Sequence, residues 1–262
     1  MNTNLRTSAS GMIAQQRMIE VIANNLANVN TTGFKRSRVS FEDVLYETVQ
    51  GARIVNYQGS ESVGPIQIGK GVRVGAVLRL HSQGSPESTG RPLDLAVEGE
   101  GFFQIQRPDG GIAYTRDGSF TLSEDGNLVT SSGYALLPGV AVPQDASGIG
   151  ISATGVVSIH GAGGGAPVEI GRLELARFLN SNGLLSIGEN AYVETPASGQ
   201  PLLGAPQDEG FGRLMQGSLE SSNVEIVQEM TDMIAAQRAY EINAKAIRAG
   251  EEMMRATDDI IR

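Results

Sequence analysis

The sequence predicts an α+β fold in which N- and C-terminal helices form a coiled-coil assembly domain and flank a central all-β domain of short antiparallel strands. Of the 34 glycines, 32 lie between Gly33 and Gly217, and all ten prolines lie between Pro65 and Pro206. Both ends also repeat apolar residues every seven positions. Because glycine and proline oppose helix interiors and favour turns, the ends are predicted as helices and the middle as strands.

The N-terminal helix is expected from about residue 4 to residue 30, with Gly33 just beyond its end. Its apolar stripe consists of residues spaced seven apart, which are Leu5, Met12, Ile19 and Leu26. A helix of this length measures roughly 40 Å. A compact β domain cannot cover such a rod, so the stripe favours pairing with the other terminal helix and with other subunits.

The C-terminal helix is expected to begin at a capping box formed by Ser222 and Glu225, and to continue to Ile261. Its stripe has the same spacing and consists of Ile226, Met233, Tyr240, Ile247 and Met254. We predict that these residues and the N-terminal stripe are the assembly contacts of the two helices.

The central region carries strand and turn signals. Residues 93–97 alternate between apolar and polar, which predicts a half-buried strand with Asp94 and Glu98 on its solvated face and a glycine bulge at residues 99–101. Turn dipeptides ending in glycine follow at steps of seven or eight, beginning at Asp109, Asp117, Asp125 and Ser132, and predict a β-meander. Residues 46–66 lack any such period and predict extended, weakly self-structured chain.

These patterns divide the chain into four segments. Residues 1–34 and 219–262 are the two halves of the coiled-coil inner domain. Residues 35–84 form an extended or β linker that contains the aperiodic stretch of about 46–66, and residues 85–218 form an outer β domain.

No catalytic, cofactor-binding or metal site is predicted. His81 and His160 have no second ligand or base at a recognised spacing. Asp94, Glu98 and Glu100 cluster as glycosidase carboxylates could, but a solvated strand face explains them more simply. A structural protein is therefore favoured over a β-rich hydrolase, and a periplasmic or surface coiled-coil binding protein remains the alternative from another class.

The composition excludes some classes of partner and limits the routes by which the chain could be exported. A net charge of −9 without a basic stripe argues against nucleic acid. The absence of cysteine excludes disulfides and cysteine-ligated metals. No apolar run approaches the roughly 20 residues of a membrane span, and the N-terminus lacks the apolar core of a signal peptide. We therefore expect a cytoplasmic protein, or one exported by a route that leaves its first residues uncut.

Residues 24–35 resemble the N-terminal signature of the rod and hook axial proteins of the bacterial flagellum. The motif residues are Asn24, Asn25, Leu26, Ala27, Asn28, Gly33 and Phe34. Four further segments resemble motifs of that family and occur in the family's order. They are residues 93–103, 114–120, 219–224 and 237–245. The length and residues 46–84 are most similar to the distal-rod members, with the proximal rod or another axial protein as the alternative.

The resemblance implies a structural subunit of the distal rod, without cofactor, that assembles helically into a rigid hollow drive shaft. The shaft would transmit motor torque to the hook and provide the export channel, and residues 46–66 would brace neighbouring subunits. The implied partners are further copies of the chain, the proximal rod, the hook-junction and hook proteins, the peptidoglycan-ring and outer-membrane-ring proteins, and the flagellar export apparatus. The implied location is the basal body, in the rod that crosses the periplasm, after export without a cleaved signal peptide.

Overall fold

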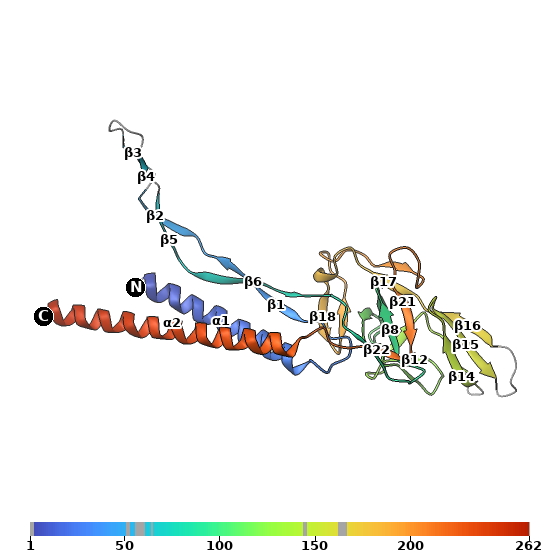
Figure 1. Ribbon diagram of the computed structural model, residues 1–262. Coiled ribbons are helices and arrows are strands. Elements are labelled where there is room, and N and C mark those ends of the chain that lie inside the picture. The colour runs from blue at the N-terminus through green and yellow to red at the C-terminus, as the bar shows by residue number, and fades with distance from the viewer. Residues whose placement is uncertain are drawn as a thin grey trace. The chain divides into compact units, whose positions relative to one another are not determined.

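The computed structural model describes residues 3–50, 53–55, 61–63, 65–143, 146–161 and 167–261 (Figure 1). It confirms the predicted class, because two contacting terminal helices flank a central domain of short antiparallel strands. The chain divides into two compact units. The helical unit consists of Met1–Leu26, Ser37–Leu78 and Glu225–Arg262, and the β unit consists of Ala27–Arg36 and Arg79–Val224.

The two long helices differ from the predicted ones at the C-terminal end of the first helix and at the N-terminal end of the second. Helix α1 (Thr3–Ala27) ends three residues before the expected boundary. Helix α2 (Ile226–Ile261) begins four residues after Ser222, so the predicted capping box is wrong. The Ser222 Oγ instead accepts a hydrogen bond from the Val224 N–H (3.3 Å), and the Glu225 carbonyl accepts the N–H of Glu229 (3.0 Å). Within the described residues, neither helix has a stretch long and apolar enough to span a membrane.

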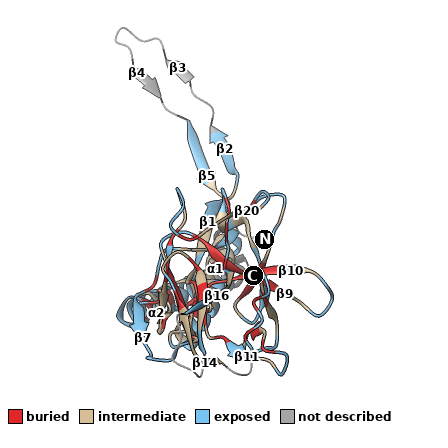
Figure 2. Cartoon of the chain, turned by 90° about the vertical axis from the view of Figure 1, so that its right-hand side faces the viewer, coloured by how far each residue is buried: buried red, intermediate tan, exposed pale blue. Residues whose placement is uncertain are grey.

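The helical unit also contains a two-stranded ribbon. It is built from three consecutive strand pairs, β1 (Ser37–Asp43) with β6 (Val72–Arg79), β2 (Tyr46–Gln50) with β5 (Ile66–Gly69), and β3 (Arg53–Val55) with β4 (Glu61–Val63). The described part of residues 46–66 is extended, as expected, and it is also paired into strands. Val49, Ile66 and Ile68 supply the strand-forming side chains that a search for periodicity missed. Strands β2 and β5 are exposed (Figure 2).

The β unit is organised around one antiparallel sheet, which has nine strands within the part of the chain that the structure describes. Its main path runs β11 (Thr121–Leu122), β12 (Leu128–Val129), β13 (Ala135–Leu137), β9 (Phe102–Gln106), β10 (Ile112–Thr115), β19 (Ala191–Val193) and β18 (Leu185–Gly188). Strand β17 (Leu175–Arg177) pairs with β9 and with β20 (Leu202–Gly204), and the short 3₁₀ helix η1 (Ser181–Gly183) follows β17.

Smaller sheets complete the β unit. The described residues form a three-stranded sheet of β14 (Ala146–Ile151), β15 (Val156–Gly161) and β16 (Val168–Arg172). Strand β8 (Leu95–Glu98) pairs with β21 (Arg213–Gln216), and β7 (Pro86–Ser88) pairs with β22 (Ser218–Glu220). Both pairs join the start of the unit to its end, so the β unit closes immediately before α2 begins.

The core lies on both faces of the central strand β9. Phe103 and Ile105 point into the larger cluster with Leu95 and Leu175, whereas Phe102 belongs to a second cluster that contains Tyr114, Ala176, Phe178 and Tyr192. Successive side chains of a strand point to opposite faces, and here both faces are covered. Two consecutive phenylalanines can therefore both be buried, as Figure 2 shows for β9.

Two details of the predicted β region are wrong. Residues 93–105 are two strands in different sheets, because β8 pairs with β21 while β9 pairs with β10, β13 and β17. Asp94 is also buried instead of solvated, and it accepts a hydrogen bond from the Thr89 hydroxyl (2.6 Å). Turn dipeptides connect β9 to β10, β11 to β12 and β12 to β13, as predicted. The fourth dipeptide, Asp117-Gly118, does not form a hairpin turn, because β10 and β11 are not neighbours in the sheet.

Candidate assembly interface

Helices α1 and α2 lie side by side and antiparallel (Figure 1). Three contacts along the pair fix a single register, because their residue numbers add to 254 or 255: Leu5 with Gly250, Gly11 with Asn243, and Asn25 with Glu229. A Cβ on Gly11 would lie 3.0 Å from Asn243 Nδ2, and one on Gly250 would lie 3.0 Å from Leu5 Cδ2. The two glycines therefore allow the helices to approach closely.

Asn25 is a buried polar link within the helical unit. Its side-chain amide donates hydrogen bonds to the Ser37 carbonyl (2.8 Å) and to Glu229 Oε2 (3.1 Å), and its Oδ1 accepts the N–H of Ser37 (2.9 Å). Asn25 and Glu229 are both fully buried. Because buried polar groups are costly when unpaired, these bonds favour one alignment of α1, β1 and α2.

The predicted heptad residues are not the most buried positions of the two helices. Leu5, Met12, Ile19, Leu26, Met233 and Ile247 are half-buried, and Ile226, Tyr240 and Met254 are exposed. The described residues of the two helices that are buried are Ala14, Ile22 and Asn25 on α1 and Glu229 and Ala236 on α2. The stripe of large apolar side chains does not include the small and polar residues among them, although Glu229, Ala236, Asn243 and Gly250 also recur every seven residues.

The helical unit leaves apolar side chains exposed. On α2 these are Val227, Met230, Ile234, Ile242 and Met253, and Val227 is 80% exposed. On the other helix, Ile13, Ala14 and Val21 line a groove of about 540 Å³ whose opposite wall is Val72, Val74 and Val77 of β6. Exposed apolar side chains and apolar grooves are typical of protein–protein contact surfaces. The predicted stripe residues that are still exposed add to the apolar surface of the helical unit.

A buried ionic cluster lies in the β unit, next to the end of the N-terminal motif. Lys35 Nζ contacts Glu220 Oε1 (2.5 Å) and the Ser82 carbonyl (2.7 Å), and Arg116 reaches the other Glu220 oxygen (3.3 Å). Burial is the main cause that lowers the pKa of Lys35, and the Glu220 carboxylate opposes it. The cluster joins residues 35, 116 and 220, which are distant in sequence, and nothing in the local sequence pattern indicated it.

The N-terminal motif residues occupy the end of α1 and the turn after it. Asn24 and Ala27 are exposed, and Leu26 is half-buried. Asn28 Oδ1 accepts a hydrogen bond from the Thr31 hydroxyl (3.1 Å) and Phe34 is buried. Gly33 has a φ of +66°, and its N–H donates to the Glu220 carbonyl (2.7 Å). Asn28, Gly33 and Phe34 therefore shape the turn that leads to Lys35, whereas Asn25 belongs to the helix contacts described above.

Of the sequence candidates for chemistry, His81 and Glu100 line one cleft of the β unit, and the three carboxylates each contact a different partner. Glu98 pairs with Arg213 (2.6 Å), Glu100 with Arg177 (3.7 Å), and Asp94 with Thr89. His81 packs edge-on against Phe102 and Tyr192. Within the described residues, no group of three or more histidine, aspartate or glutamate side chains is placed to hold a metal ion.

Family comparisons match this architecture from end to end. Three family models match the chain: "Flagella basal body rod protein" over residues 5–35, "Flagellar hook protein FlgE/F/G D1 domain" over residues 96–159, and "Flagellar basal body rod FlgEFG protein C-terminal" over residues 215–260. The first and last include most of α1 and α2, and the middle one lies in the β unit.

Full-length relatives refine the match. The chain is 46% identical to flagellar basal-body rod protein FlgG of Caulobacter vibrioides over 257 residues, and 46% identical to FlgG of Borreliella burgdorferi over 260 residues, each covering 98% of both chains. The flagellar basal-body rod protein FlgF of Caulobacter vibrioides is 34% identical over 260 residues, which is 98% of this chain and 96% of FlgF.

These findings define an axial structural protein of the flagellum, not an enzyme. The chain belongs to the FlgG family of flagellar basal-body rod proteins and is a structural subunit of the distal rod. The identity to FlgF is lower than the identity to FlgG of the same organism, which favours the FlgG family.

Proposed function

We propose that the chain self-assembles through its terminal helices into a rigid hollow shaft that transmits motor torque to the hook and provides the export channel. Residues 1–34 and 219–262 form the inner coiled-coil domain, residues 35–84 the linker, and residues 85–218 the outer β domain. The observation that carries the proposal is the apolar surface left exposed on α2 and in the α1–β6 groove of a single chain. Copies packed side by side would bury both surfaces.

In this proposal the shaft crosses the periplasm and has several neighbours. The proximal rod lies below it, and the hook-junction and hook proteins lie above it. The peptidoglycan-ring and outer-membrane-ring proteins surround it. The flagellar export apparatus delivers the subunit without cleaving a signal peptide. Support for these assignments comes from the family membership alone.

The helix contacts are tested by Ile247→Asp. Ile247 is half-buried on α2, so a carboxylate there would be desolvated when a second copy packs against it. We expect the variant to form no polymer, while the unfolding transition of the β unit stays unchanged. The control Ile247→Val keeps an apolar side chain and should assemble. Normal polymers from Ile247→Asp, or discrete trimers from the wild type, would contradict the proposal.

The ribbon is proposed to brace neighbouring subunits. A two-stranded ribbon is only marginally stable alone, and this one exposes Leu45, Tyr46, Val49, Ile66 and Ile68. Support from adjacent copies would bury those side chains and stiffen the shaft. Deletion of residues 46–66 should therefore give polymers that electron microscopy shows as bent or flexible. Straight polymers of wild-type stiffness would refute the bracing role without affecting the helix contacts.

A further inference from the structure

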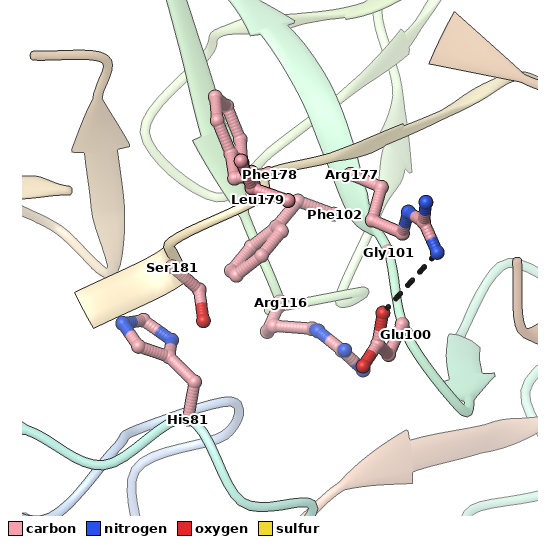
Figure 3. A pocket seen from close by; sticks show the side chains of 9 residues that line it. All are labelled: His81, Glu100, Gly101, Phe102, Arg116, Arg177, Phe178, Leu179 and Ser181. Carbon is pink, nitrogen blue, oxygen red and sulfur yellow. Dashed lines mark ion pairs between the residues drawn. The ribbon is translucent and has the colours of Figure 1, made fainter. Parts of the chain in front are cut away.

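The β unit has a concave site that the helix-based assembly does not use. It is a cleft of about 230 Å³ at the junction of β9, β17 and η1. Figure 3 shows His81 and Ser181 on one side of the cleft, the rings of Phe102 and Phe178 beside them, and Arg177 with Glu100 on the other side. Arg116 also lines the cleft, and its guanidinium carbon lies 5.1 Å from the centre of the Phe102 ring.

The side chains in and around the cleft carry more positive than negative charge. Arg116 and Lys35 are both buried and share one buried carboxylate, Glu220. Arg177 donates a hydrogen bond to the Gly210 carbonyl (3.3 Å), and its carboxylate partner within the described residues is Glu100, at 3.7 Å, whose side chain is 75% exposed. The guanidinium of Arg116 donates to the Val97 and Gly99 carbonyls as well as to Glu220. Its Nε–H is buried and has no hydrogen-bond partner within the described residues.

The neutral groups of the cleft can also donate hydrogen bonds. Both ring nitrogens of His81 are buried and without hydrogen-bond partners among the described residues. Burial, followed by the charges of Lys35, Arg116 and Arg79, lowers the pKa of His81 to about 3, so the ring is neutral near pH 7 and carries one N–H donor. The Ser181 hydroxyl adds another donor. A carboxylate, which only accepts hydrogen bonds, matches this set.

Apolar side chains lie beside the donors. Leu179 lines the cleft and is 93% exposed. Leu202 and Leu203 of β20 are half-exposed, and Leu202 stands opposite Arg177 in the β17–β20 ladder. A partner that fits would present a carboxylate next to an aliphatic side chain.

We propose that this cleft receives an aspartate or glutamate side chain from a second copy of the chain, with Leu179 packing against its apolar neighbour. The occupant follows from charge complementarity, because the chain has 29 acidic against 20 basic residues, yet the cleft is basic. The inference rests on the proposed polymer, which keeps other copies adjacent. It adds a contact between β units to the contacts between helices.

A photo-crosslinking experiment identifies the occupant. The full chain carries p-benzoylphenylalanine in place of Leu179, is polymerised and irradiated, and its adducts are mapped by mass spectrometry. We expect adducts to a second copy within a few residues of an aspartate or glutamate, and no such adducts in dilute monomer. The same probe in place of Leu122, which is 41% exposed on β11, is the control and should not give these adducts.

Polymers without intermolecular adducts at position 179, or adducts confined to surface without a carboxylate, would overturn the inference and leave the proposed function intact. Failure of the wild-type chain to polymerise would instead refute the proposed function, and the inference would fall with it. The two failures are therefore distinguishable.

Substitutions measure what the contact contributes. Arg177→Gln and Leu179→Ser should each raise the critical concentration for polymerisation several-fold while the unfolding midpoint of the monomer stays unchanged, and Arg177→Lys should have a smaller effect. Raising sodium chloride should increase the critical concentration of the wild type more than that of Arg177→Gln, because salt screens charge pairs. Equal critical concentrations for wild type, Arg177→Gln and Leu179→Ser would overturn the proposal.

Discussion

The Asn25 side-chain amide lies 3.1 Å from Oε2 of Glu229, although 204 residues separate them in the chain. The same amide binds the backbone of Ser37 at the start of β1. One asparagine thus links α1, the ribbon and α2, which are the three separate segments of the helical unit. The helical unit consequently requires both ends of the chain, and the link sets the register in which the ends meet.

Asn25→Ala should weaken the helical unit. The substitution leaves Glu229 Oε2 and the Ser37 backbone without their Asn25 hydrogen bonds in a buried site, which costs about 1–3 kcal/mol. We expect the temperature at which the polymer disassembles to fall, as followed by circular dichroism and light scattering. Gln237→Ala alters an exposed side chain on α2 and should change stability by less than about 0.5 kcal/mol. Equal effects of the two variants would contradict the role of Asn25.

Glu220→Gln should strongly destabilise the β unit. It removes the one carboxylate that both Lys35 and Arg116 contact, and an uncompensated buried charge costs about 3–5 kcal/mol. Glu98→Gln is the matched control, because the pair of Glu98 with Arg213 is exposed to solvent, which screens it. Urea unfolding of the two variants measures the difference. A loss for Glu220→Gln as small as that for Glu98→Gln would show that the cluster is not structurally important.

Gly33→Ala should cost more than Gly90→Ala, although both glycines have positive φ angles of +66° and +70°. A Cβ on Gly33 would lie 2.7 Å from the backbone at Arg116 and Asp117, whereas one on Gly90 meets nothing within 4 Å. We expect Gly90→Ala to cost about 1 kcal/mol for the backbone conformation alone, and Gly33→Ala to cost clearly more. Urea unfolding measures both, and equal losses would mean that the close approach at Gly33 relaxes freely.

Acidification should destabilise the β unit through His81. Its pKa is lowered to about 3 in the folded chain, mainly by burial, from an ordinary value of 6.5. Between these values the unfolded chain binds a proton that the folded chain does not, so stability is lost as the pH falls. From pH 7 to pH 5 this amounts to about 1–2 kcal/mol.

The variants at the two histidines isolate that effect. His81→Phe keeps an aromatic ring beside Phe102 and Tyr192 and should lose this part of the pH dependence of urea unfolding. His160→Gln should keep it. The same loss of stability between pH 7 and pH 5 in wild type and His81→Phe would refute the claim that protonation of His81 destabilises the folded β unit.

The sequence was sufficient for the features that local periodicity and turn chemistry determine. The fold class, the two long helices and three of the glycine turns follow from such patterns. The end of α2 at Ile261 was also predicted correctly. Its start was not, because Ser222 forms a local turn with Val224 instead of the cap.

Features that depend on distant segments were not predictable in this way. The alternating pattern predicts a solvated Asp94, but in the fold Asp94 is buried and accepts a hydrogen bond from the Thr89 hydroxyl. The seam of the helix pair uses small and polar residues such as Gly11 and Asn243, whose fit depends on the antiparallel register. The Lys35–Glu220–Arg116 cluster likewise exists only after β7 and β22 have paired.

Hydrogen exchange in α2, compared between dilute monomer and polymer, tests the central claim most directly. The claim is that apolar surface of the terminal helices is buried only by other copies, so packing from those copies supplies most of the stability of the helices. We predict fast exchange of the amides around Ile247 in the monomer and strong protection in the polymer. Equal, strong protection in both states would show that a single chain already stabilises its helices, and would contradict the account.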